Sequence, residues 1–65
     1  MDWKLVQYEQ QGYVKGASAR IKDDDTPIVL VSNPKLINNI IHVWVALQQD
    51  TFTRFLININ DIELI

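Results

Sequence analysis

The sequence predicts a small all-β fold, a barrel of about five strands, and leaves open a short N-terminal helix. Two observations carry this prediction. Near the C-terminus, apolar and polar residues alternate with period two on both sides of a short polar segment, as in a β-hairpin. β-branched residues, which favour strands, dominate from Ile28 onward. We expect residues 1–65 to form one small domain, whose limited burial must be offset by dense packing or by association.

Residues 2–11 fit two structures. In a helix, Asp2 would be the N-cap and Gly12 the residue that ends it. In a strand, Trp3 and Leu5 would share one face and Gln11 would begin a turn. The sequence alone does not decide between them.

The next strand is expected at Tyr13–Lys22. Gly16 interrupts it and predicts a bulge or bend of the kind that curls a short sheet into a barrel. Alanines alternate along one face, including Ala19, so a bulky side chain should fill the space opposite. Trp3 and Trp44 are the candidates.

Asp23–Pro27 predicts a solvated turn, because its three adjacent carboxylates repel one another and its proline cannot donate to a sheet. Clustered carboxylates also suit hard cations, but a calcium-binding loop spaces its ligands at alternate positions around a glycine. That spacing is absent, so we predict no metal site. The apolar run Ile28–Ser32 then predicts a strand buried on both faces.

Two structures compete for residues 34–49. Asn33 and Pro34 are typical of a helix start, and the residues that follow form an amphipathic helical pattern. The alternative fold is therefore α+β, with a helix at 34–49. Few of these residues are strong helix formers, however, and the middle is rich in β-branched residues. We therefore expect a strand at Ile40–Leu47, which a polar turn joins to a second strand at Phe52–Ile59.

The closing segment Phe55–Ile65 resembles the closing motif of the Sm family, in which an isoleucine, a basic residue, a glycine and an asparagine precede a final apolar strand. Ile57 takes the position of the isoleucine and Asn60 that of the asparagine. Asn58 and Ile59 replace the basic residue and the glycine, at the positions that shape the family's RNA pocket. The resemblance implies an SH3-like or Sm-like barrel.

Composition and motifs argue against several classes of protein. The net charge of −2 disfavours a domain held mainly by nucleic-acid phosphates, and the absence of cysteine excludes disulfides and thiolate metal sites. No catalytic nucleophile pattern surrounds His42, the single histidine, and no glycine-rich phosphate loop exists. We therefore expect neither an enzyme nor a cofactor. With no membrane-spanning run and no apparent signal peptide, a cytoplasmic protein is expected.

Large apolar side chains occur on both faces of the predicted strands, although a small barrel has only one interior. The second face should then be covered by a helix or by another chain, and a helix at residues 2–11 would cover only part of it. We therefore expect self-association, with Trp44, Phe52 and Leu56 as anchors. The leading hypothesis is a small non-catalytic regulator that binds itself and another protein, such as the inhibitors and adaptors that phages encode.

Two other functions are weighed against this one. The first is an Sm-like nucleic-acid-binding ring, which the net charge disfavours. The second is a protein that sequesters small nucleotides. In either case the candidate contacts are three cations and the asparagine of the closing motif, namely Lys15, Arg20, Arg54 and Asn60.

Overall fold

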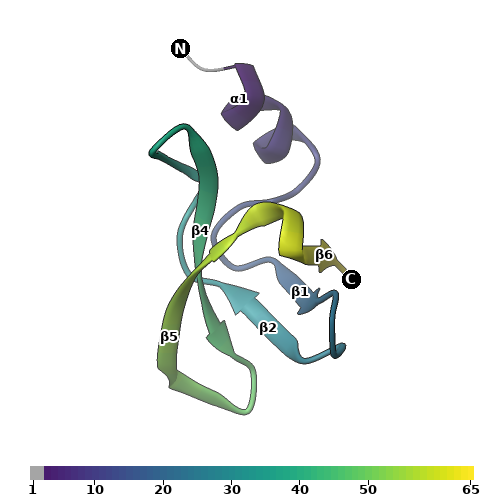
Figure 1. The fold of residues 1–65 in the computed structure, drawn as a ribbon. Coiled ribbons are helices and arrows are strands. Elements are labelled where there is room, and N and C mark those ends of the chain that lie inside the picture. The colour runs from purple at the N-terminus through teal and green to yellow at the C-terminus, as the bar shows by residue number, and fades with distance from the viewer. Residues whose placement is uncertain (1–2) are drawn as a thin grey trace.

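The structure, a computed structural model that describes residues 3–65, is a curled antiparallel sheet that forms a half-barrel, with one short N-terminal helix (Figure 1). The predicted all-β fold class is confirmed. Within the described residues the elements are the helix α1 (Trp3–Gln10), the strands β1 (Ser18–Ile21), β2 (Pro27–Leu30), β3 (Lys35–Ile37), β4 (Ile40–Leu47), β5 (Asp50–Asn58) and β6 (Ile62–Leu64), and the 3₁₀ turn η1 (Ile59–Asp61) between the last two strands.

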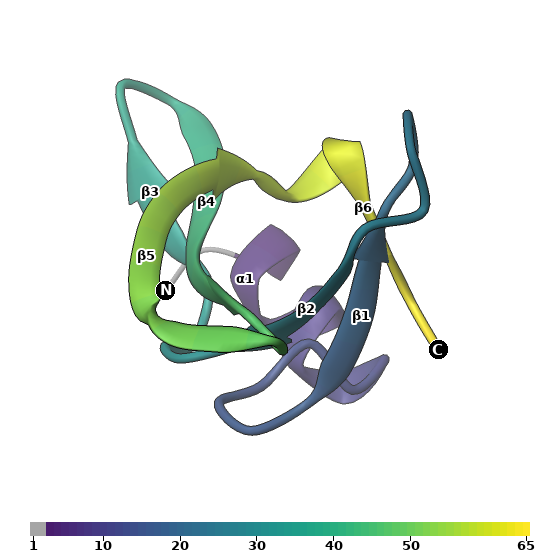
Figure 2. The same ribbon diagram turned by 90° about the horizontal axis from the view of Figure 1, so that it is seen from below.

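The sheet is organised around β4. Its first half pairs with β3 and its second half with β2, while β5 pairs along its other edge. Beyond β2 the order continues through β1 to β6. Figure 2 shows that this sheet curls, so that β5 and β6 lie on opposite sides of the opening and η1 connects them.

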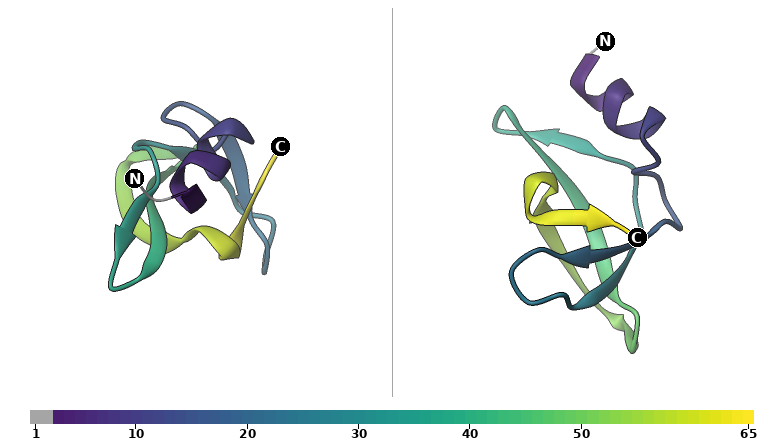
Figure 3. Two further views of the ribbon diagram at one scale, coloured as in Figure 1. Left: turned by 90° about the horizontal axis from the view of Figure 1, so that it is seen from above. Right: turned by 90° about the vertical axis from the view of Figure 1, so that its right-hand side faces the viewer.

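Residues 3–10 are helical, which settles the ambiguity at the N-terminus. The helix ends in a Schellman motif: Gly12 N–H donates to the Glu9 carbonyl at 3.1 Å and Tyr13 N–H to the Tyr8 carbonyl at 3.0 Å. Gly12 has a φ of +105°, which only glycine adopts freely. The view from above in Figure 3 shows α1 lying across one end of the curled sheet.

The first strand is shorter than predicted. Residues 13–17 form a loop, in which Gly16 has a φ of +94° and its N–H donates to the Leu30 carbonyl at 2.7 Å. The predicted bulge within the strand is therefore wrong. Ala19 is fully buried, but the space opposite is not filled by a tryptophan, because Trp3 is 75% exposed and Trp44 40% exposed. The isoleucines, leucine and valines of the core occupy it instead.

The predicted strand at Ile40–Leu47 is confirmed, because it is β4 with the same bounds. The alternative helix at residues 34–49 is not formed, since this segment is a β-hairpin of β3 and β4. Ile37 lies opposite Ile40, and the two-residue turn between them has positive φ at both positions, 51° at Asn38 and 65° at Asn39. These angles are those of a type I′ turn, which asparagine tolerates. The hairpin adds β3, so the described chain has six strands rather than about five.

Replacing Asn39 by valine is expected to destabilise the protein by about 1–2 kcal/mol, because a β-branched side chain is sterically strained in left-handed backbone. Glycine at the same position should preserve or raise stability, since Asn-Gly is the preferred type I′ pair. Urea unfolding followed by circular dichroism measures both variants. Equal stability of the valine and glycine variants would contradict the turn assignment.

One interior cluster fills the half-barrel. It is formed by the buried members of β1, β2, β4, η1 and β6, namely Ala19, Ile28, Leu30, Ile41, Val43, Val45, Ile59 and Ile62. In β2 only alternate residues are fully buried. Val29 and Val31, the residue after the strand, are half-buried, so the prediction that both faces are buried is only partly met. No helix within residues 3–65 is long and apolar enough to cross a membrane.

Candidate functional site

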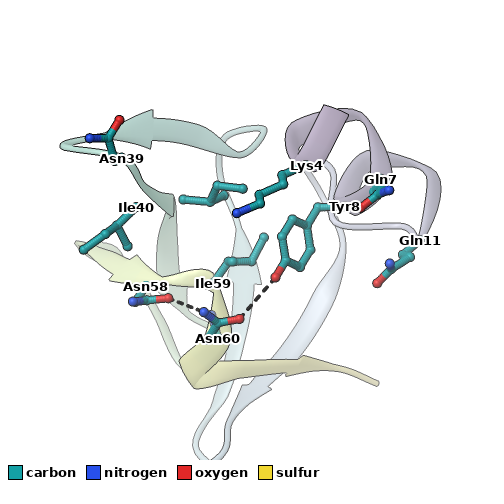
Figure 4. A pocket seen from close by; sticks show the side chains of 10 residues that line it. Lys4, Gln7, Tyr8, Gln11, Asn39, Ile40, Asn58, Ile59 and Asn60 are labelled. Atoms are coloured by element: carbon teal, nitrogen blue, oxygen red, sulfur yellow. Dashed lines mark hydrogen bonds between the residues drawn. The ribbon is translucent and has the colours of Figure 1, made fainter. Parts of the chain in front are cut away.

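A cleft of about 540 Å³ opens where α1 meets the β3–β4 turn and the end of β5 (Figure 4). Its lining comes from three separate parts of the chain: Lys4, Gln7, Tyr8 and Gln11 from the helical segment, Asn39, Ile40 and Ile41 from the hairpin, and Asn58, Ile59 and Asn60 from the closing segment. Most of these side chains are polar, and five of them are carboxamides.

Two asparagines fix the wall of this cleft at η1. The Asn58 side-chain oxygen accepts the N–H of Asn60 at 2.9 Å, so Asn58 is the N-cap of the 3₁₀ turn. The Tyr8 hydroxyl donates to the Asn60 side-chain oxygen at 3.1 Å. This second bond joins α1 to η1, segments that are 52 residues apart in the sequence.

The cleft has an excess of hydrogen-bond donors. The oxygens of Asn58 and Asn60 are engaged, which leaves their NH₂ groups for other partners. Within residues 3–65, the side chains of Gln7, Gln11 and Asn39 have no hydrogen-bond partner. None of the described lining residues is a carboxylate, and Lys4 adds a cation. Such a surface suits a ligand that carries carbonyl, ring-nitrogen or anionic oxygen acceptors.

The structure does not bring the four predicted contact residues together. Asn60 lies in the cleft. Arg20 is on β1 and Arg54 on β5, and the sheet order places β2 and β4 between them. Lys15 lies in the loop before β1, where its backbone N–H donates to the Asn33 side chain at 2.9 Å. Within one chain Lys15, Arg20 and Arg54 therefore do not form a single cationic site, and their predicted role at junctions between subunits stays a prediction.

Arg20 is already engaged in an ion-pair network. Its guanidinium donates to Glu63 of β6 at 2.8 Å and also pairs with Asp25 in the β1–β2 turn. The hydrogen bond that Arg20 donates to Glu63, followed by the charges of Glu63 and Asp25, raises the pKa of Arg20 above its ordinary value. Asp24 accepts the Thr26 N–H at 3.0 Å, so the acidic turn is ordered by its own side chains. The network holds β1, β6 and the turn together.

Exposed apolar side chains mark the outer face of the β4–β5 hairpin. Trp44 lies opposite Leu56, on the face away from the core residues Val43 and Val45. The two side chains are 40% and 36% exposed. Ala46, the next outward residue of β4, is fully buried. Together Trp44 and Leu56 form an apolar cross-strand pair, which we call the outer pair.

Phe52 lies apart from the outer pair, in an irregular section of β5. Leu47 pairs with Asp50 and Ala46 with Arg54, so residues 51–53 have no partner on β4. The Asp50 carboxylate accepts the Thr53 hydroxyl at 2.6 Å and the Phe52 N–H at 3.2 Å. The hydrogen bond from the Thr53 hydroxyl is the largest cause of the lowered pKa of Asp50, and the bond from the Phe52 N–H lowers it further. Phe52 itself is 96% exposed.

His42 is placed where its ring bonds to its own strand. Its Nδ1 is 2.9 Å from the Ile40 carbonyl oxygen. The described part of the chain holds no group of three or more His, Cys, Asp or Glu side chains that could bind a metal ion.

The sequence interpretation missed most of the cleft, although a signal was present. Lys4, Gln7, Tyr8 and Gln11 follow the spacing i, i+3, i+4, i+7, which places them on one face of a helix. The same face was not recognised because helix and strand were both open for residues 2–11. Asn39 was missed with the hairpin turn to which it belongs.

Comparisons with family models, with curated proteins and with solved structures find no match to this chain. The resemblance of residues 55–65 to the Sm closing motif therefore stays a prediction.

Proposed function

We propose that the protein is a small non-catalytic binding protein that acts as a homo-oligomer. The observation that carries this proposal is the outer pair of Trp44 and Leu56, two large apolar side chains that lie together on the sheet face away from the core. Tryptophan is among the residues most enriched at interface hot spots. Contact between this pair and a second copy removes apolar surface from water and supports a chain whose own core is small.

Sedimentation velocity of the unmodified chain at micromolar concentration tests this proposal. The expected result is a species of at least twice the chain mass, with a sedimentation coefficient that falls on dilution. A concentration-independent monomer would overturn the proposal. The number of chains in the oligomer also sets the number of clefts that it presents. An adaptor or inhibitor could use several of these clefts to bind its partner.

A second candidate function is supported by the cleft, which we infer binds a nucleobase-containing ligand. Carboxamide side chains pair with the hydrogen-bonding edges of bases, and tyrosine rings provide stacking surface. The cleft combines both with a lysine that suits a phosphate. The positions that the Sm resemblance associates with RNA are those of Asn58 and Ile59; both residues line the cleft, although both depart from the family's motif.

Replacing Gln7 by alanine is expected to weaken binding of a fluorescent single-stranded oligoribonucleotide, because it removes a donor from the cleft. Gln10 is a matched control, since it lies on the same helix outside the cleft lining. Fluorescence anisotropy measures both variants, and a shallow salt dependence is expected because few cations take part.

Equal binding by the Gln7→Ala and Gln10→Ala variants would contradict the cleft as the site. Mononucleotides tested in competition separate the two nucleotide functions. If a mononucleotide displaces the oligoribonucleotide at a similar concentration, sequestration of small nucleotides is favoured over binding of an RNA strand.

A further inference from the structure

β5 has an open edge. The directions of the N–H and C=O groups along this edge follow from the hydrogen bonds of the neighbouring strand β4. The Trp44 N–H donates to the Ser32 hydroxyl at 3.1 Å and its carbonyl accepts the Val31 N–H at 2.9 Å, so both groups are directed toward the β2 side. In an antiparallel ladder the direction alternates from residue to residue. Leu56, opposite Trp44, therefore directs its N–H and C=O away from β4.

The same alternation applies to Arg54 and Asn58, which lie two residues on either side of Leu56. Within residues 3–65 no strand pairs with this edge of β5. The segment Arg54–Asn58 also lacks the features that protect edges, since it holds no proline and only one charged residue. The peptide groups of Arg54 and Leu56 and the N–H of Asn58 are thus available to another strand, whereas the Asn58 carbonyl accepts the first hydrogen bond of η1.

The outer edge of β6 has fewer free N–H and C=O groups than the edge of β5. Ile65 N–H donates to Ser18 at 3.1 Å and Lys22 N–H to the Asp61 carbonyl at 2.9 Å, so the odd-numbered residues of this segment face β1. Of the remaining positions, the Ile62 N–H is already bonded to the Ile59 carbonyl. Leu64 is then left with a complete outward peptide group. β5 is therefore the edge best suited to pairing between chains.

We propose that two copies of the chain pair antiparallel along this edge, with Leu56 opposite Leu56 of the second copy. This inference rests on the proposed self-association and assigns its interface. In this register Arg54 lies opposite Asn58 of the other copy, so the Leu56 N–H and C=O pair in both chains and the Asn58 N–H of each chain faces the Arg54 carbonyl of the other. The pairing joins two half-barrel sheets into one continuous sheet with two-fold symmetry.

The side chains in this register match on both faces. On the outer face, Leu56 of each copy meets the other, and the two outer pairs become a row of four apolar side chains. On the inner face, Phe55 lies opposite Ile57 of the second copy, and both are half-buried next to the core. Apolar and aromatic cross-strand pairs are those that stabilise sheets.

Neighbouring registers are less favourable. A pairing centred on Arg54 would place two guanidinium groups opposite each other, and like charges directly opposite are destabilising. A pairing centred on Phe52 would need the Phe52 N–H, which the Asp50 carboxylate already accepts at 3.2 Å. It would also leave Leu56 beyond the paired segment.

Because the chain contains no cysteine, single-cysteine variants report the register directly. A hydrogen-bonded pair separates its Cα atoms by about 5.5 Å, which matches the span of a disulfide. Leu56→Cys is therefore expected to form a covalent dimer under mild oxidation at least about tenfold faster than Phe52→Cys. Phe52 is a stringent control, because it is far more exposed and should react faster if accessibility alone decided the rate.

A second measurement does not depend on the leucine side chain. Arg54→Cys and Asn58→Cys should each form little covalent dimer alone and should cross-link to each other when mixed. Rapid dimer formation by Arg54→Cys alone would overturn the register. An oligomer in sedimentation without either cross-link would overturn the β5 edge while self-association stands. A monomeric unmodified chain would overturn the proposed function itself.

Discussion

Replacing Leu56 by aspartate is expected to convert the protein into a monomer. The carboxylate would lie at the centre of the proposed interface, opposite its own copy, where it would be both desolvated and next to a like charge. Loss of a large interface anchor commonly costs about 2 kcal/mol or more in binding free energy. Sedimentation velocity at matched concentrations measures the change. The melting temperature should fall as well, because association stabilises the folded chain.

Val14→Asp provides a matched control for this experiment. Val14 is 38% exposed, close to the 36% of Leu56, but it lies in the loop between α1 and β1. The control should keep the oligomer of the unmodified protein. Phe52→Asp should have a smaller effect than Leu56→Asp, since Phe52 lies outside the paired segment. An unchanged oligomer in Leu56→Asp would exclude the outer pair from the interface.

Truncation of Ile28 to alanine should have the largest effect on folding. Ile28 is completely buried and sits on β2, between β1 and β4, at the middle of the sheet. Removing a buried isoleucine side chain costs about 2–5 kcal/mol, which approaches the whole stability of a domain this small. The variant is expected to lose most of its cooperative urea transition.

Ile40→Ala is the matched control for Ile28→Ala, because it removes the same atoms from a side chain that is 47% exposed. Its urea midpoint should lie close to that of the unmodified chain. Both variants are measured by circular dichroism at one protein concentration, since association contributes to stability. Similar midpoints for the two variants would show that the core is not centred on β2.

The main hairpin was predictable because its β-branched residues and period-two alternation outweighed the competing helical pattern. Val43 and Val45 alternate with His42 and Trp44, and the structure buries the valines and exposes the tryptophan. The strand at residues 35–37 was not predicted, because a three-residue strand has almost no periodicity and Asn33-Pro34 has the form of a helix start. The Asn38-Asn39 pair was the available signal for a turn.

The cleft was harder to predict than the fold. Its residues come from three segments, and only a known helix at residues 3–10 places Gln7 and Tyr8 on the same side as Asn60. Sequence reasoning favoured cations as ligand contacts, on the grounds that charge attracts phosphate. The structure instead uses Arg20 to hold β1 to β6. Side-chain amides carry no charge, so the charge pattern of the sequence did not indicate them.

The loose attachment of α1 has a consequence for motion. Within Trp3–Gln10 no residue is fully buried, and the Tyr8–Asn60 bond is exposed to solvent. Such an element opens at a lower free energy than a sheet core, as an independent unit. Its amide hydrogens should then exchange with solvent while those of β4 stay protected. Because the helix is one wall of the cleft, each opening also dismantles the site, and any ligand that bridges the two walls must bear the free-energy cost of holding the helix closed.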